Sequence, residues 1–537
     1  MTGKKRTRLM AGIAMTASLL LGANAAQAGP WQRAESAHFI VYSGYPAEKT
    51  KEHVATLETY RYMLSLFYGL SEDDENSAKQ LIYLVGNTED MHTTLPGLTD
   101  QAAGYFNESC PIDQVAVAVY GGTFGTEALK RAGEDRILKQ PENISQTILF
   151  HEYAHSFMFH HSEINYPPWF VEGFADFYGP TRIAGNTVAV GVPPIFRSYT
   201  LSYGGGMSYA ELLRSSKAVW ENTPQKSQDF YAQSWVLTHY LMSDEGRRSK
   251  LNAFFEAYNN GTDAVAAFET TFGIKVDDLH DLIAAYMKNQ LKATVYSIKD
   301  IPATASTIVT LPASSHRLAL LDAATRNCPQ PKYAPKVLAD IREEAAKYPG
   351  DDYASLVLAR AEDVLGDEEK ALDFLKTYTA AHPDDAAAQY LLGLTWYLMT
   401  EHSKINAGET ADSQMAHARE AFVRAYKLDD HNAPNLYYLS LAQKGLPGYP
   451  NQTAVDAAIQ AHMLTPAVPT YALRAAELLA QTDRLAEARM MLVPLASNPH
   501  APARSAWARA IVAAIDAGKG KDEVLKMLGT PLGKDDD

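Results

Sequence analysis

The sequence predicts an α+β domain followed by an all-α array of helical repeats. Short β-rich runs are confined to the first 120 residues, and stretches with helical spacing of apolar residues continue to about residue 290. Beyond residue 330, helix-ending residues recur at similar intervals, which is typical of stacked helical hairpins. We therefore expect a first domain at 29–295, a linker at 296–329, helical repeats at 330–520 and a polar C-terminal tail at 521–537.

The first 28 residues have the order of a secretory signal peptide. Four basic residues come first, then an uncharged run, then a small-residue cleavage site: Lys4, Lys5, Arg6, Arg8, Leu9–Gly22 and Ala26–Ala28. The remaining chain has no apolar run near the roughly 18 residues that span a bilayer. We expect an exported bacterial protein, periplasmic or secreted, without a transmembrane segment.

Composition excludes two classes of protein. The chain carries a formal net charge of −15 with histidine neutral, which argues against a nucleic-acid-binding surface. Cys110 and Cys328 are its only cysteines, so a disulfide-stapled small fold and a multi-cysteine zinc site are excluded. These two residues can form one long-range disulfide in an oxidising compartment or remain buried thiols, and the sequence leaves both open.

The first domain is expected to begin with a small sheet and to continue with helices. Strands are expected at 38–43, 80–85, 103–106 and 115–120. Helices are expected at 47–70, 144–160, 168–178, 229–242 and within 248–290. The run at 115–120 can be an edge strand that binds an extended peptide through main-chain hydrogen bonds, or ordinary sheet core.

A change of composition separates the two halves of the chain. Residues 293–315 are rich in Thr, Ala, Ser and Pro and lose helical periodicity, which indicates a linker. Helix-ending residues then recur about every 33 to 46 residues, at Pro349, Pro383, Asp429-Asp430, Pro466 and Pro499. The longest interval holds a polar insert near 401–413. The pattern resembles a tetratricopeptide array, which would offer a surface for a protein partner; an ordinary helical bundle is the alternative.

The residues that indicate chemistry lie in the helix expected at 144–160. His151 and His155 are four residues apart, so both imidazoles face the same side of a helix and can share a metal ion. Glu152, beside them, can hold a water molecule. The helix is apolar nearly all round, which is typical of a core helix. Two histidines and a glutamate buried there would need a compensating partner, and a cation supplies it.

A third ligand is expected from the segment that follows. Catalytic zinc needs three protein ligands and an open fourth position. Pro167-Pro168 would turn the chain so that a second helix crosses the first and Glu172 points at the histidines. Gly173 would let these two helices approach closely. Asp176, on the same helical face as Glu172, would accept the other ring proton of a ligating histidine, or would otherwise be a surface charge.

Together the segments His151–His155 and Trp169–Asp176 resemble the gluzincin metallopeptidases, and in particular the peptidase MA-like proteins of bacterial envelopes. The resemblance extends over about residues 31–290. It implies zinc (Zn2+) held by His151, His155 and Glu172, with Glu152 as general base. Asp176 would then contact one of the metal-binding histidines. The chain matches all of these positions. Because many members have no assigned substrate, the resemblance defines the chemistry more firmly than the target.

Peptide hydrolysis at such a site would use a water molecule whose pKa the zinc lowers and whose proton Glu152 takes. A further donor would stabilise the oxyanion formed from the peptide carbonyl. Tyr231 is the first candidate, since related enzymes supply a Tyr or His from a helix after the third ligand. His239 is the second. Tyr231 can equally be an aromatic side chain packed in the helix through Trp235.

Other interpretations remain open. A metzincin would use His161 as third ligand, but Met158 stands where that pattern has Gly, and in a continuing helix His161 faces away from His155. His160 and His161 would then mark a helix end, where their charge suits the dipole. The main functional alternative is an envelope binding or scaffold protein with a vestigial zinc site. A hydrolase of a non-peptide envelope component is a third. The intact Glu152 favours the peptidase, because structural zinc needs no general base.

Overall fold

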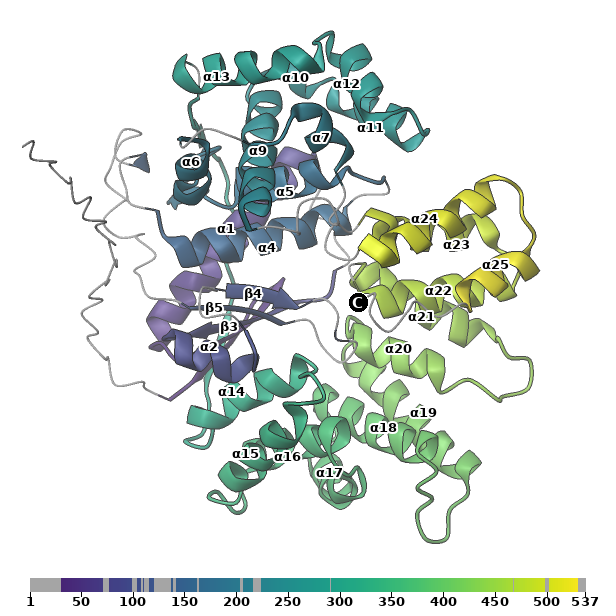
Figure 1. Ribbon diagram of the computed structural model, residues 1–537. Coiled ribbons are helices and arrows are strands. Elements are labelled where there is room, and N and C mark those ends of the chain that lie inside the picture. The colour runs from purple at the N-terminus through teal and green to yellow at the C-terminus, as the bar shows by residue number, and fades with distance from the viewer. Residues whose placement is uncertain are drawn as a thin grey trace, which may run out of the picture.

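The computed structural model describes most of the chain and shows an α+β architecture. The described residues are 30–70, 77–98, 104–107, 110, 115–119, 137–138, 142–161, 164–202, 206–215, 224–289, 291–466, 468–497 and 502–529. The expected signal peptide at 1–28 and the last residues of the expected tail, from 530, lie outside this set. In Figure 1 a central sheet lies beneath a group of helices, and a curved array of further helices runs along one side.

A six-stranded mixed sheet forms the centre of the first half. Its strands are β1 (Gln32–Glu35), β2 (Phe39–Ser43), β3 (Gln80–Val85), β4 (Gly104–Asn107), β5 (Val115–Val119) and β9 (Thr307–Thr310). They lie in the order β4-β5-β3-β2-β1-β9; β2, β3 and β5 are parallel, and the other pairs are antiparallel. Since β5 is paired on both sides, the interpretation of 115–120 as an edge strand is wrong. The valines and alanines of β5 suit an interior strand, which is covered on both faces.

Helices cover both faces of the sheet. Successive side chains of a strand point to opposite faces, so a strand of consecutive apolar residues needs cover on each face. In β3, Ile82 and Leu84 belong to the core under α1 (Ala47–Tyr68), α4 (Ile144–His160) and α5 (Pro168–Tyr178). Leu81, Tyr83 and Val85 face a separate cluster with α2 (Thr88–Thr94) and α14 (Ser315–Arg326). Figure 1 shows α4 on one side of the strands and α2 with α14 on the other.

The rest of the first half is a small sheet and a group of helices beyond α5. The sheet has β6 (Arg182–Ala184), β7 (Thr187–Val190) and β8 (Thr294–Ser297). The helices are α6 (Ile195–Ser202), α7 (Tyr209–Arg214), α9 (Pro224–Met242), α10 (Glu245–Arg248), α11 (Leu251–Asn259), α12 (Ala264–Phe272), η2 (Val276–Asp278) and α13 (Leu279–Asn289).

The stretch expected to be a linker is built into the fold. It contributes β8 and β9, and β9 pairs with β1 in the central sheet from Gln32↔Thr310 to Glu35↔Thr307. α14 then packs its apolar side on the sheet through Ala319, Leu320 and Ala323. The β-branched run Thr-Ile-Val-Thr of β9 is short and lies among Pro, Ser and Thr. The local composition therefore indicates a linker, and the run forms a strand because it pairs with the sheet.

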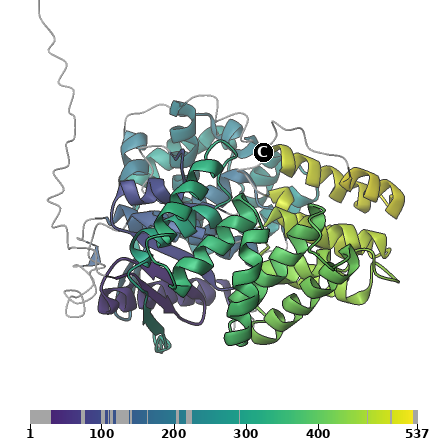
Figure 2. The same cartoon turned by 90° about the horizontal axis from the view of Figure 1, so that it is seen from below.

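From α14 to the end of the described chain all elements are helices. They are α15 (Ala334–Ala345), α16 (Asp352–Leu365), α17 (Glu369–Ala381), α18 (Ala386–Glu401), α19 (Ala411–Leu428), α20 (Ala433–Leu441), α21 (Gln452–Leu464), α22 (Pro469–Gln481), α23 (Leu485–Ser497), α24 (Pro502–Asp516) and α25 (Lys521–Leu528). Figure 2 shows them stacked in succession. Each expected helix-ending position follows the end of a helix, namely α15, α17, α19, α21 and α23. The expected polar tail differs, because α25 buries Val524 in the last core cluster.

Candidate metal centre

The candidate site lies where α4 crosses α5. Asn143 caps α4 by accepting a hydrogen bond from the Gln146 amide at 3.2 Å, and Pro167-Pro168 starts α5 with fixed backbone angles. A Cβ atom on Gly179 would lie 3.0 Å from the Thr147 carbonyl oxygen and 3.2 Å from the His151 Cβ. Gly179, the residue after α5, therefore lets the end of α5 approach α4 closely.

Gly173 has a different neighbour from the one expected. A Cβ atom there would collide with the Thr238 side chain and the Ser234 carbonyl oxygen, both on α9. The prediction that Gly173 lets α4 and α5 approach is wrong, because the α5 face that carries Gly173 packs on α9. The close packing of α5 on α9 still matters for the site, because α9 carries Tyr231.

His151, His155 and Glu172 converge on one point. The His151 and His155 Nε2 atoms lie 3.1 Å apart, and each lies close to Glu172 Oε2, at 3.6 Å and 3.4 Å respectively. Three donors bound to zinc at about 2.0–2.1 Å with tetrahedral angles lie about 3.3 Å from one another. Glu172 is fully buried and His155 is 5% exposed, while His151 is half-buried. Donor types and spacing therefore both fit a zinc ion.

Asp176 lies behind His151. Its Oδ1 is 3.0 Å from His151 Nδ1, so Nδ1 donates to the carboxylate and Nε2 is left to face the other donors. Burial by itself would lower the pKa of His151, but the carboxylates of Asp176, Glu172 and Glu152 together outweigh it and raise that pKa to about 10 in the metal-free protein. Asp176 is 5% exposed, which excludes the alternative of a surface charge.

Arg197, on α6, is a residue of the site that the sequence did not reveal. Its Nε donates to Asp176 Oδ2 at 2.7 Å and its Nη2 to Asp176 Oδ1 at 3.3 Å. Burial would raise the pKa of Asp176, but Arg197 and His151 hold it below the usual value. A buried acid at Asp176 signals the need for a cation, yet no spacing rule could have identified which one.

Tyr231 reaches the same site from α9. The Arg197 guanidinium lies over its ring, 4.6 Å from the centroid. The pKa of Tyr231 is raised first by burial and then by the Glu172, Asp176 and Glu152 carboxylates, which places its hydroxyl in their field. Glu152 itself is half-buried on α4, next to His151. The phenol thus stays protonated and able to donate a hydrogen bond.

His239, the second candidate donor, is committed elsewhere. It is fully buried; Nε2 donates to the Gly191 carbonyl at 2.9 Å, and Nδ1 is 2.7 Å from the Tyr286 hydroxyl. With both ring nitrogens engaged by Tyr286 and Gly191, His239 has no donor left for the site.

The histidines at the end of α4 also lie outside the centre. The His161 ring packs on Phe157, with centroids 4.4 Å apart, and His161 is not among the converging ligands. Met158 is buried in the core. The expectation that charge on His160 suits the helix dipole is wrong, because burial lowers the pKa of His160 to about 4.

Comparisons of the chain with protein-family models, with curated proteins and with solved structures found no match. Within the ranges that the structure describes, no helix has both the length and the apolarity needed to cross a bilayer.

Proposed function

We propose that this protein is an exported zinc-dependent metallopeptidase with a gluzincin-like domain and a tetratricopeptide-like array. The observation that carries the proposal is the set of three donors, two imidazole nitrogens and one carboxylate oxygen, at mutual distances of 3.1–3.6 Å with a glutamate next to them. A His-His-Glu set leaves the fourth position of zinc open, as catalysis requires, whereas structural sites are closed by protein ligands.

Each residue of the site has a task in peptide hydrolysis. His151, His155 and Glu172 would hold the zinc. The bound metal would supply Lewis acidity toward a water molecule and a peptide carbonyl. Glu152 accepts the proton of the attacking water and delivers it to the leaving amine. Tyr231 donates a hydrogen bond to the oxygen on which negative charge develops.

Asp176 and Arg197 keep the histidine in place. Asp176 fixes the ring orientation and the tautomer of His151, and the two hydrogen bonds from Arg197 fix Asp176 in turn. The same guanidinium lies over the Tyr231 ring, so one side chain connects the metal ligands to the proposed oxyanion donor.

The substrate is proposed to be a polypeptide in extended conformation bound along β4. In the part of the chain that the structure describes, β4 pairs only with β5 and so forms one edge of the sheet. Main-chain groups at a sheet edge can pair with a peptide backbone of any sequence. Export is supported by the order of charges in the first 28 residues and by the disulfide between Cys110 and Cys328.

Metal analysis combined with a peptide-library assay tests the function. We expect about one zinc per chain and cleavage that a chelator abolishes. Glu172→Ala should lose most of the zinc, while His161→Ala should keep it. Loss of zinc from the His161 variant but not from the Glu172 variant would favour the metzincin interpretation. Full zinc with no cleavage of any peptide would favour the scaffold alternative.

A further inference from the structure

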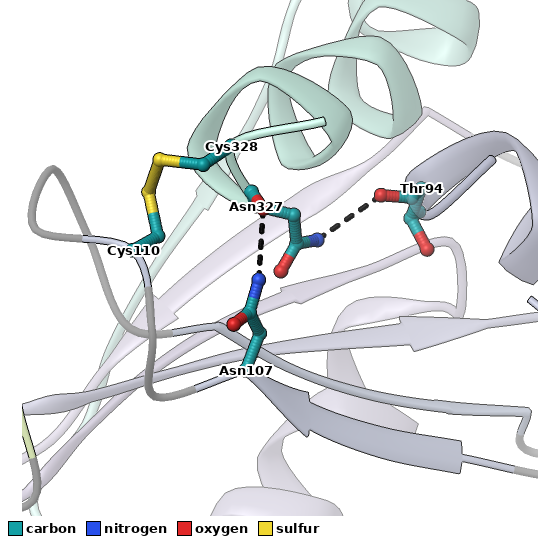
Figure 3. Close-up of a disulfide and its surroundings, with 5 residues drawn as sticks. All are labelled: Thr94, Asn107, Cys110, Asn327 and Cys328. Atoms are coloured by element: carbon teal, nitrogen blue, oxygen red, sulfur yellow. Dashed lines mark hydrogen bonds between the residues drawn. A yellow bond between two sulfur atoms is a disulfide. The ribbon is translucent and has the colours of Figure 1, made fainter. Parts of the chain in front are cut away.

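The end of α14 is joined to the edge of the central sheet by a covalent bond and by side-chain hydrogen bonds. Cys328 forms a disulfide with Cys110, 218 residues earlier, in the connection between β4 and β5. Cys328 has a φ of +50°, a conformation uncommon for a residue with a side chain. Figure 3 shows the disulfide beside Asn327, which precedes Cys328 in the chain.

Asn327 connects three segments at this point. Its Nδ2 donates to the Tyr105 hydroxyl on β4 at 2.8 Å and to the Thr94 carbonyl at the end of α2 at 3.0 Å. Its own carbonyl accepts from Asn107 Nδ2, again on β4, at 2.8 Å. Asn327 is 1% exposed. The four-residue strand β4 is thus held from the α14 side at two of its residues.

The other face of β4 lies against the helix that carries the candidate metal ligands. A Cβ atom on Gly104 would be 3.0 Å from Ile148 Cγ2, on α4. Ile148 and Glu152 are four residues apart and so lie on the same side of α4. Side chains alternate along a strand, so Tyr105 and Asn107 face α14 while Gly104 faces α4. β4 therefore lies between α14 on one face and α4, the helix that carries His151 and His155, on the other.

We propose that Asn327 and the Cys110–Cys328 disulfide position edge strand β4 for binding of the polypeptide substrate, and that reducing this disulfide weakens substrate binding. Asn327 is a positioning residue here, since it contacts β4 and not the substrate. The proposal rests on the function proposed above and adds a redox control to the same site.

The two cysteines of the disulfide differ in exposure. Cys110 is 1% exposed, whereas Cys328 is half-buried at the surface of the joint. A dithiol reductant therefore attacks the Cys328 sulfur as a thiolate and displaces Cys110 as a thiolate, which takes up a proton. The second thiol of the reductant then attacks the mixed disulfide and releases Cys328 as a thiol. The S–S bond gains two electrons, and the reductant ends as its own disulfide.

The test compares oxidised protein, protein reduced with a phosphine that does not bind zinc strongly, and two sets of variants. In the first, Cys110→Ser with Cys328→Ser removes the disulfide and makes the protein insensitive to the reductant. In the second, Asn327→Ala removes the bonds to Tyr105 and Thr94. Asn435→Ala is the matched control, since Asn435 is a fully buried asparagine of the array that donates to the Phe422 carbonyl at 3.0 Å.

Reduction and Asn327→Ala should each raise KM for an unfolded polypeptide on the order of tenfold, with kcat and zinc content unchanged. Hydrogen exchange at residues 104–107 should become faster in both cases, and the Asn435 control should change neither quantity. Unchanged KM and exchange after reduction would overturn the proposal, as would a parallel fall of kcat and zinc content, which indicates general destabilisation. If oxidised protein cleaves no peptide, the proposed function and the substrate-binding role fail together, and exchange at β4 still decides the positioning role.

Discussion

Arg197→Gln is the substitution whose effect follows most directly from the structure. The variant removes two hydrogen bonds to Asp176, at 2.7 and 3.3 Å, and takes the guanidinium away from a carboxylate that is only 5% exposed, so that His151 remains beside it. Breaking a buried ion pair from one side costs about 3 kcal/mol in free energy of unfolding. Because Asp176 then orients His151 less well, we also expect zinc affinity to fall about 10- to 100-fold.

The assay is a zinc competition titration with a chromophoric chelator, together with urea unfolding of the metal-free protein. The control is Arg214→Gln, because Arg214 makes the same two-pronged contact with Asp263, at 2.7 Å for both bonds, on an exposed surface. Exposed pairs contribute little, so this variant should keep wild-type zinc affinity. Equal zinc affinity in wild type and Arg197→Gln would refute the role of Arg197 in holding Asp176.

Three further predictions concern packing, catalysis and pH. Gly173→Ala should lower the free energy of unfolding by about 1–3 kcal/mol in urea titrations, because its Cβ collides with α9, whereas Gly44→Ala meets only ordinary contacts and should change it by less than about 1 kcal/mol. Tyr231→Phe should lower kcat on the order of tenfold or more with zinc content unchanged in steady-state assays; an unchanged kcat would reduce Tyr231 to packing. Burial lowers the pKa of His53 to about 3 and of His462 to about 4, so the unfolded chain takes up protons first as pH falls below about 6.5. Stability should therefore decrease from about pH 6.5 downward, and replacing either histidine by Gln should flatten that slope by up to ~1.4 kcal/mol per pH unit.

The parts of the site that follow from local geometry could be predicted from the sequence. Residues four apart on a helix share a face, so His151 and His155 needed only the helix to be brought together. Glu172 and Asp176 share a face for the same reason, and the two prolines before them indicated the turn. Arg197 could not be predicted, because its position depends on how α6 packs beside α5, and no fixed spacing connects the two.

Long-range pairing limited the prediction of the fold in the same way. β9 reaches the central sheet after more than 270 residues from its partner β1, so its strand character depends on a neighbour that the local sequence does not contain. The choice between one disulfide and two thiols at Cys110 and Cys328 also required the tertiary structure. The helix ends of the array were predicted well, because Pro and Asp end helices locally.

The measurement that tests the central claim most directly compares wild type with Glu152→Gln for zinc content and for cleavage of unfolded polypeptides. Glu152 is the proton acceptor of the proposed hydrolysis and is not one of the three metal ligands. We expect the variant to fold, to keep about one zinc per chain and to lose about a hundredfold or more in kcat, with Glu245→Gln on exposed α10 as an unaffected control. Chelator-sensitive cleavage that is as fast in Glu152→Gln as in wild type would contradict the account.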